Sequence, residues 1–363
     1  MYNQNIKAMR RYFILIIAVV LAGLTWQCSR NSGMDSEFKL NTNLKSSLQT
    51  SADKVNNALT QIAETPGYQL LSAQTGLKSG ESYTDSITMD LVKGVYEYMP
   101  DSTQPTCFNC ASRLFKKTGI SDNFVVKLPQ KLIFHPHYLH YYDPGNNKLT
   151  NNFIITANDY HFYYTSGMLY DYKLSAGFEL DSSNIGSLYI LSSLNTSSGL
   201  DFSSKYSFEN GYYISVSSQS GDTTSSMIAL SSDTGTLFKE TASFTGDHHW
   251  GMHHADYTLT IGNVEIHRLA SFDSIQVYLN GVLQQKATVQ FIDSSDSTTD
   301  EHSVCSDRDI QITFDDGTSV KLSTLIQPSL TILRSVIGNM RNMYFATDIV
   351  DYIAYNIYRN RIQ

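Results

Sequence analysis

Four histidines within seven residues form the group in this sequence that is best suited to metal coordination. They are His248, His249, His253 and His254. Imidazoles at both ends of a short turn can converge on Zn(II) or Cu(II), and Asp247 and Asp256 lie close enough in sequence to orient the rings. Gly251 in the centre favours a loop over a helix, so the spacing does not force the rings onto one face. We therefore expect a solvated hairpin loop, with a Zn or Cu site as the alternative hypothesis.

Cysteine spacing indicates a second candidate for chemistry. Cys107 and Cys110 have the CxxC spacing of redox and zinc motifs, but the sequence contains no second CxxC. No thioredoxin-like pattern of a strand followed by a helix frames the pair. We expect a disulfide between Cys107 and Cys110, or between one of them and Cys305. An exchange-active thiol pair is the alternative.

Recognisable catalytic motifs are absent from the sequence, which contains no nucleophile elbow, HExxH, Walker, GxGxxG or EF-hand pattern. The acidic pair Asp315-Asp316 is followed by Gly317, a composition typical of a tight turn rather than of catalysis. A net charge of -8 and an isoelectric point near 5.6 disfavour nucleic acid as a partner. These features predict a protein that is not an enzyme and needs no cofactor.

The N-terminal stretch decides where the rest of the chain is located. Arg10 and Arg11 precede an apolar run over residues 12–24, and Cys28 follows shortly afterwards. About a dozen apolar residues behind a basic pair are too few for a comfortable membrane span but match the apolar region of a secretory signal. The sequence therefore predicts export.

A Cys placed just after such a run resembles the lipobox of bacterial lipoproteins. The resemblance covers this stretch alone and implies that the signal, residues 1–27, is removed and that Cys28 is acylated. Ser29 follows Cys28 where an Asp would signal inner-membrane retention, which favours the outer membrane. The expected location is the cell envelope, with a lipid in the membrane as the anchor. An uncleaved single-span anchor and ordinary signal cleavage remain the alternatives.

Apolar spacing divides the exported part into a leash, a helix and a large β region. Residues 28–38 comprise the lipidated Cys and a flexible leash, because they are polar and lack periodicity. Leucines and other apolar residues recur every three or four positions over 39–66, which predicts an amphipathic helix. Residues 328–363 repeat this pattern with Ile349, Ile353 and Ile357, which predicts a C-terminal helix.

Residues 67–327 have the composition of an antiparallel β domain. Short turn sequences separate runs of β-branched and aromatic residues, and each such turn predicts a hairpin. They are Asn210-Gly211, Asp233-Thr234-Gly235, Gly262-Asn263, Asn280-Gly281 and Asp316-Gly317. A faint repeat suggests two related sheet units, at about 150–245 and 246–327. In the strand over residues 159–165, both faces are aromatic, which indicates either a core strand or half of a ligand platform; we expect the core.

The expected fold is therefore mainly β with flanking helices. It is an antiparallel β-meander, folded as a sandwich or an open curved sheet, with the N-terminal and C-terminal helices packed on it. We expect a membrane-tethered, non-enzymatic binding or envelope-structural module. The alternatives are a Zn- or Cu-handling lipoprotein that uses the His248–His254 loop and a carrier of apolar ligands in a curved-sheet cavity.

Overall fold

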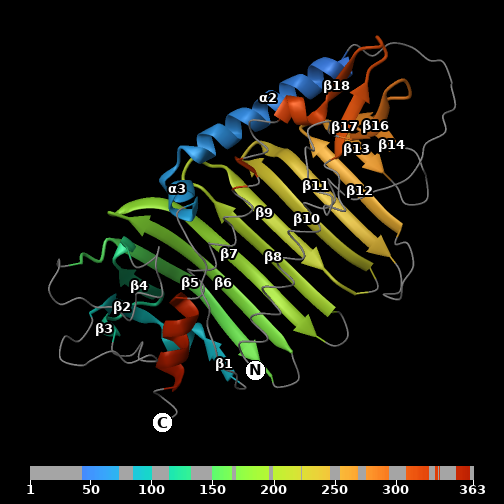
Figure 1. Cartoon of the computed structure of the whole chain (residues 1–363). Helices are drawn as coiled ribbons and strands as arrows, with labels where there is room; N and C mark the ends of the chain where they lie inside the picture. Colours follow the sequence, from blue (N-terminus) through green and yellow to red (C-terminus); the bar gives the residue numbers. More distant parts are fainter. Residues whose placement is uncertain are drawn as a thin grey trace, which may run out of the picture. The chain divides into compact units, whose positions relative to one another are not determined.

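The computed structural model contains two compact units, each built mainly of antiparallel strands (Figure 1). The first unit has its described residues within 64–211 and 335–363, and the second within 43–63 and 212–334. The structure describes residues 43–72, 85–99, 114–131, 149–165, 169–195, 199–221, 223–245, 254–268, 275–293, 308–326, 332–333, 335 and 349–359. Each unit is described separately below.

The first unit is built on strands β1 to β8. Their bounds are β1 Asp85–Thr88, β2 Gly94–Tyr98, β3 Phe115–Gly119, β4 Phe124–Leu128, β5 Phe153–Tyr164, β6 Tyr170–Leu180, β7 Ser183–Asn195 and β8 Gly199–Ser207. They follow the order β8-β7-β6-β5-β4-β2-β3, and β1 pairs with β5 beyond the end of β4. The pairing is antiparallel except between β2 and β4, which run parallel. Two short helices, α3 Pro66–Ser72 and α4 Met89–Val92, belong to the same unit.

The second unit contains strands β9 to β18 and helix α2. Their bounds are α2 Asn43–Ala63, β9 Tyr213–Gln219, β10 Thr223–Ser232, β11 Gly235–Thr245, β12 His254–Ile261, β13 Val264–Arg268, β14 Ile275–Leu279, β15 Val282–Leu283, β16 Thr288–Asp293, β17 Arg308–Thr313 and β18 Ser319–Lys321. Strands β9 to β15 lie in sequence order, each antiparallel to the next, as a meander. Strands β16 to β18 form a separate three-stranded antiparallel sheet.

Tight turns join the neighbouring strands of the second unit where the sequence predicts them. Strand pairs flank the turns at 233–235, 262–263, 280–281 and 316–317. Asn280 and Gly281 adopt φ values of 51° and 77°, the left-handed conformation that both central positions of a type I′ turn require. The Asn-Gly pair therefore fixes the register between β14 and β15.

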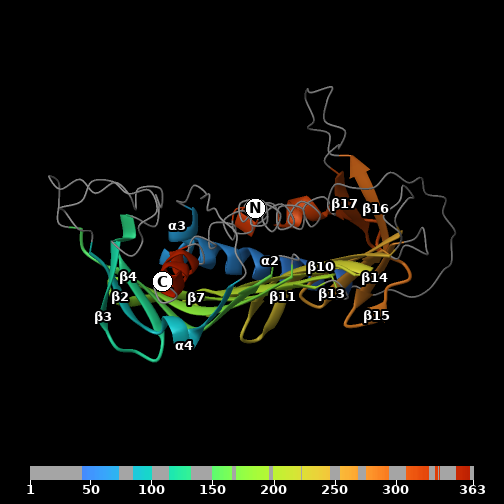
Figure 2. The ribbon, with the colours of Figure 1, turned by 90° about the horizontal axis from the view of Figure 1, so that it is seen from below.

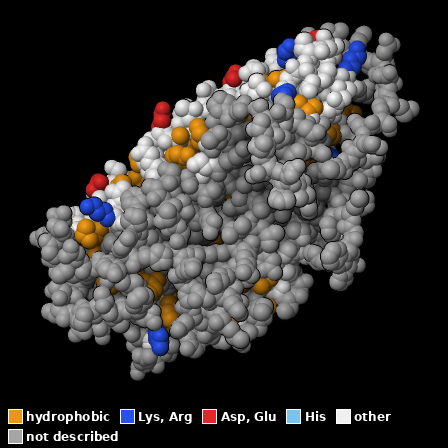
Figure 3. All heavy atoms as spheres, viewed as in Figure 1, with side chains coloured by type: hydrophobic (Ala, Val, Ile, Leu, Met, Phe, Trp, Pro, Cys, Tyr) orange, Lys and Arg blue, Asp and Glu red, His pale blue; other side chains and the backbone are white. Residues whose placement is uncertain are grey.

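Helix α2 covers part of the sheet in the second unit and packs against β11, β12 and β13. Its buried side chains recur every three or four residues and so form one stripe, as the apolar spacing predicts. They are Leu44, Leu48, Ser51, Ala52, Val55, Ala58, Leu59 and Ile62. The outward side of the helix carries mostly polar side chains with scattered charges (Figure 3).

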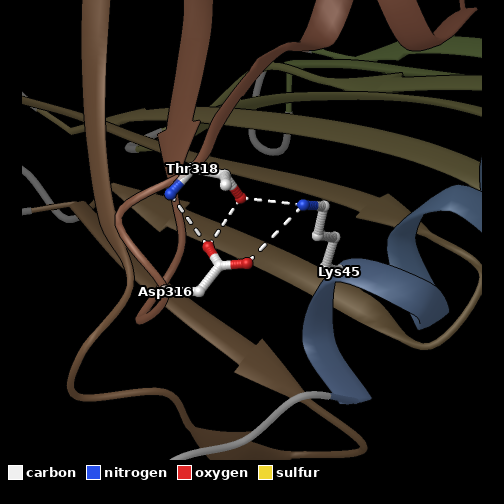
Figure 4. Close-up of polar contacts among 3 residues, drawn as sticks. All are labelled: Lys45, Asp316 and Thr318. Atoms are coloured by element: carbon white, nitrogen blue, oxygen red, sulfur yellow. Dashed lines mark hydrogen bonds and ion pairs between the residues drawn. The ribbon is translucent and has the colours of Figure 1, made fainter.

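The first turn of α2 is fixed to the β17–β18 hairpin by polar contacts (Figure 4). Asp316 accepts hydrogen bonds from the backbone N–H and the hydroxyl of Thr318, at 2.8 and 2.6 Å. Lys45 Nζ lies 3.6 Å from Asp316 Oδ2 and donates to Thr318 Oγ1 at 2.8 Å. The hydrogen bonds from Thr318 and the charge of Lys45 lower the pKa of Asp316. Asp316 thus has a structural role in its turn, as the sequence indicates.

In the first unit, the covered face of the sheet is an aromatic core. Edge-on ring contacts run across the strands from Tyr96 to Phe124, from Phe124 to Tyr160 and from Tyr160 to Tyr172, with centroids 5.4 to 6.3 Å apart. Tyr160 is buried in this core, which agrees with the core interpretation of its strand.

Helical residues 349–359 lie over the sheet of the first unit (Figure 2), and a carboxylate holds them to the aromatic core. Asp351 Oδ1 accepts hydrogen bonds from the hydroxyls of Tyr160, at 3.0 Å, and Tyr172, at 3.2 Å. Ile349, Val350, Ile353 and Ala354 are buried around it. The C-terminal apolar pattern therefore packs on the sheet as predicted.

The expected fold class is confirmed: the chain is mainly β, with a large, mostly antiparallel curved sheet and helices near both termini. Two local expectations are wrong. Ile87, Met89 and Leu91 alternate with Thr88 and Asp90 in the sequence, which predicts a strand over 87–91. The strand ends at Thr88 instead, and Met89–Val92 is helical because Lys93 N–H closes the turn on Met89 O at 2.9 Å. The segment 100–123 reads from the sequence as a long loop with one helical turn around 113–117. Residues Phe115–Gly119 form strand β3 instead, where Phe115 is buried opposite Tyr98.

The close approach of α2 to the β12–β13 turn generates a stability prediction. A Cβ on Gly262 would collide with Ser51 Oγ and lie 2.7 Å from Ser51 Cβ, whereas a Cβ on Gly281 would have no atom within 4 Å. Both glycines have positive φ, 60° and 77°. Gly262→Ala should therefore lower the free energy of unfolding by about 1–3 kcal/mol more than the matched control Gly281→Ala, as measured by urea denaturation.

Replacing Ser51 with Gly in the Gly262→Ala background should recover part of that difference, measured as the coupling term of a double-mutant cycle. Equal losses for Gly262→Ala and Gly281→Ala would show that α2 does not pack against this turn.

Candidate functional site

Most residues predicted to do chemistry lie outside the described part of the chain. They are Cys28, Cys107, Cys110, His248, His249 and His253. His254 begins β12, where its Cα pairs with Thr245. Within the described ranges, no group of three or more His, Cys, Asp or Glu side chains is arranged to hold a metal. The metal site, the disulfide and the lipidated Cys therefore stay predictions.

The described helices include none that is both long enough and apolar enough to cross a bilayer.

The second unit contains a group of polar side chains on the covered face of its sheet. Ser226 on β10, Glu240 on β11 and Tyr257 on β12 are 6%, 4% and 8% exposed. Ala242 on β11 pairs with Ser226 on β10 and with Tyr257 on β12. Glu240 lies two residues before Ala242 on the same strand. Residues two apart on a strand share a face, so the three side chains occupy neighbouring positions. We call them the buried polar cluster.

The buried polar cluster is unsatisfied in its hydrogen bonding. Ser226 Oγ, Glu240 Oε1 and Tyr257 OH are inaccessible to solvent, and none of them makes a hydrogen bond of normal geometry in the described structure. The Glu240 carboxyl and the Tyr257 hydroxyl nevertheless lie close enough to interact with each other. A buried polar atom without a partner destabilises the fold by about 1–3 kcal/mol. Glu240 and Tyr257 offset part of this cost through each other, whereas Ser226 Oγ stays without a partner among the described residues.

Burial dominates the electrostatics of the cluster. Removal from water raises the pKa of Glu240 to about 8, and the nearby Tyr257 hydroxyl lowers it by a smaller amount. Burial, with the Glu240 charge as a second cause, also raises the pKa of Tyr257 well above its usual value. At neutral pH the cluster is therefore uncharged, and the Glu240 carboxyl can donate a hydrogen bond.

Sequence reasoning missed this cluster, although a signal for it exists. On β11, Phe238 and Ala242 are buried at alternate positions, and Glu240 lies between them in the same alternation. A carboxylate at an inward position of an alternating strand breaks the apolar pattern. Its proximity to Tyr257 depends on the register between β11 and β12, which the sequence does not specify.

The first unit presents polar and aromatic side chains on the face of its sheet opposite the aromatic core. Lys173 Nζ lies 2.6 Å from Asp159 Oδ2, and His161 Nε2 lies 3.6 Å from Asp171 Oδ2. The hydrogen bond to Asp159 and its charge raise the pKa of Lys173. Two tyrosines on this face are exposed. We call these residues the open face: Asp159, His161, Tyr163, Asp171, Lys173 and Tyr189.

The two exposed tyrosines lie at opposite ends of the paired charges. Tyr163 and Tyr189 are 39% and 37% exposed. Tyr189 on β7 pairs with Ser175 on β6, which pairs with Asp159 on β5. Tyr163 lies four residues after Asp159 on β5, so the two tyrosines are two strands and four residues apart. Strand geometry gives a separation of about 16 Å. The open face can therefore contact an extended ligand at two aromatic points.

No protein family model matches the chain, and no curated protein or solved structure matches it at a significant level.

The raised pKa of Glu240 predicts a pH-dependent stability. Between about pH 4.5 and pH 8 the folded state retains a proton that the unfolded state releases, so folding becomes less favourable as the pH rises, by up to about 1.4 kcal/mol per pH unit. Glu240→Gln stays neutral and should lack this component. Urea denaturation at pH 5, 6.5 and 8 should therefore show the variant gaining stability relative to wild type at each step.

A difference between variant and wild type that is constant across the three pH values would contradict the buried, neutral carboxyl.

Proposed function

We propose that this protein is a non-enzymatic binding module of the cell envelope, tethered by a lipid on Cys28, and that its open face binds a neutral glycan. The single observation that carries the proposal is the open face itself. There, two exposed tyrosines flank the Lys173–Asp159 ion pair and the His161–Asp171 contact. The protein would hold its ligand without transforming it.

The open face is suited to recognition because its side chains stand on long paired strands. Strands β5, β6 and β7 are paired along almost their whole lengths. The aromatic core and the helical residues 349–359 support the opposite face. A rigid platform loses little conformational entropy on binding, and Tyr offers a large contact area with few rotatable bonds.

The charge distribution favours an uncharged, hydroxyl-rich ligand. The charge of Asp159 is paired with that of Lys173, and His161 contacts Asp171, so the open face offers donors and acceptors without a cluster of charges of one sign. Nucleic acid would need unpaired cations. A protein partner would be expected to cover an apolar centre. Between the two tyrosines, the side chains of β5 and β6 on this face are polar, and Leu191 on β7 is apolar. Sugar rings match this face because their C–H groups stack on aromatic faces and their hydroxyls bond to the polar groups.

The tether is proposed from the sequence. Arg10 and Arg11, the apolar run at 12–24 and Cys28 resemble a lipoprotein signal. Such an anchor would keep the folded units next to the envelope, where glycans are abundant. Outer-membrane attachment follows from Ser29 in the same way.

Loss of the exposed rings should weaken glycan binding. Tyr163→Ala and Tyr189→Ala each remove a stacking surface while leaving the paired charges in place. Each should reduce affinity by about tenfold, or about 1.4 kcal/mol. The matched controls Tyr163→Phe and Tyr189→Phe keep the rings and should stay within about threefold of wild type. The measurement is retention on insoluble peptidoglycan, chitin, cellulose and xylan, followed by titration with soluble fragments of the polysaccharide that binds.

Two results would contradict the glycan proposal. One is equal retention of wild type and the Ala variants, or no retention on any of the four polysaccharides. The other is binding to envelope fractions that is abolished by protease but survives glycosidase treatment, because that result would identify a protein partner.

Replacing Cys28 with Ser should release the protein from membranes. Acyl chains on Cys28 would anchor it almost permanently, because each buried CH₂ contributes about 0.8 kcal/mol. Fractionation and intact-mass measurement of wild type and Cys28→Ser test this. A Cys28→Ser protein that stays in the membrane with the mass of residues 1–27 would instead support an uncleaved anchor.

A further inference from the structure

We propose that the open face binds one extended glycan chain of several sugar units, which runs diagonally across the strands from Tyr163 to Tyr189, and that Lys173 selects the middle units. This inference rests on the proposed function and goes beyond it, because it specifies the length and the path of the ligand and a residue that determines specificity. A monosaccharide or disaccharide would contact one ring at a time.

The path follows from the register of three neighbouring strands. Tyr163 on β5 pairs with Asp171 on β6, and Tyr189 on β7 pairs with Ser175 on β6. Lys173 lies halfway between Asp171 and Ser175 on β6. Because residues two apart on a strand share a face, a straight line from Tyr163 to Tyr189 passes over Lys173. Lys173 therefore divides the separation of about 16 Å into two diagonal steps of about 8 Å each.

The contacts of Lys173 agree with this central position. Its Nζ lies 2.6 Å from Asp159 Oδ2. The hydrogen bond to Asp159 is the main cause of the raised pKa of Lys173, and Tyr189 and Asp171 are smaller causes. Lys173 thus lies near Tyr189 at one end of the path and near the residue opposite Tyr163 at the other.

The ion pair at the midpoint retains hydrogen-bonding capacity for a ligand. An ammonium has three N–H donors and a carboxylate has several lone pairs, so one contact between them leaves others available. Lys173 is solvent-exposed over much of its side chain, with 40% relative accessibility. The pair can therefore donate to one hydroxyl of a sugar unit and accept from a neighbouring hydroxyl. Leu191, which pairs with Lys173, adds an apolar surface beside the same unit.

The spacing of the rings sets the size of the ligand. A separation of about 16 Å exceeds the length of a disaccharide, so a short sugar reaches one tyrosine and leaves the other uncovered. In a longer chain the second ring contact is intramolecular, because the paired strands hold both tyrosines on one sheet. Affinity should therefore rise with chain length until both rings are covered and then stay constant.

The test measures affinity against chain length. The probes are the di-, tetra- and hexasaccharides of the cellulose, chitin and xylan series and peptidoglycan strand fragments of matched lengths, titrated into the full-length protein by calorimetry. In the series that binds, the hexasaccharide should bind at least tenfold more tightly than the disaccharide, with one chain per protein molecule. Tyr163→Ala and Tyr189→Ala should each bring the hexasaccharide to within about threefold of the disaccharide.

Three lysine variants test the central contact. Lys173→Met keeps a long side chain but cannot donate, and should lower hexasaccharide affinity by about tenfold. Lys173→Arg keeps the charge and the donors and should stay within about threefold of wild type. The matched control Lys127→Met removes a lysine from another ion pair of the same sheet, 3.1 Å from Glu97 Oε1 and outside the path, and should leave affinity unchanged. Melting curves verify that each variant is folded.

Other outcomes overturn the proposal in distinguishable ways. Equal affinity for the disaccharide and the hexasaccharide would leave glycan binding intact but would show that the site holds short sugars. Two hexasaccharides per protein molecule would show that each tyrosine binds its own chain. Unchanged affinity in Lys173→Met would exclude the central contact. Absence of binding by every probe would reject the glycan proposal itself and this inference with it.

Discussion

Successive side chains of a β-strand point to opposite faces, and this alternation constrains every functional surface of the protein. Strand β5 shows the consequence, because Tyr160 is buried in the aromatic core while His161 and Tyr163 belong to the open face. The core and the proposed binding surface are therefore built from the same strands. Residues that stabilise one face position the other, and Asp351 contributes by fixing the helical residues 349–359 to Tyr160 and Tyr172.

The covered face of the sheet in the second unit is not wholly apolar, although burial favours apolar side chains. A carboxyl group at an inward position of β11 stays neutral because a buried charge without a partner is more costly than a retained proton. The neighbouring Tyr257 hydroxyl interacts with this carboxyl, and Ser226 Oγ is buried without a partner among the described residues. Natural cores contain few such groups, so the cluster is an irregularity of this sheet.

Much of the fold was predictable because local chemistry determines it. Apolar residues three and four apart predicted α2, and Asn280-Gly281 predicted a hairpin because both positions need positive φ. Errors arose where tertiary contacts decided the outcome: Phe115 joined a strand because it packs opposite Tyr98. The open face and the buried polar cluster depend on which residues of neighbouring strands lie opposite each other. Register of that kind is not readable from a single sequence, although the inward Glu240 was a visible irregularity.

Strand alternation places Glu240 on the buried face of its sheet. The most direct test of this placement is the protonation state of the Glu240 carboxyl in the folded protein. Carbon-13 NMR of protein labelled at the Glu side-chain carboxyl, assigned by comparison with Glu240→Gln, reports this state as the pH is varied. The burial of Glu240 predicts one carboxyl that stays protonated at neutral pH and titrates near pH 8. Titration of the Glu240 signal near pH 4.5, as for a solvent-exposed glutamate, would show that this position is not buried and would contradict the strand register.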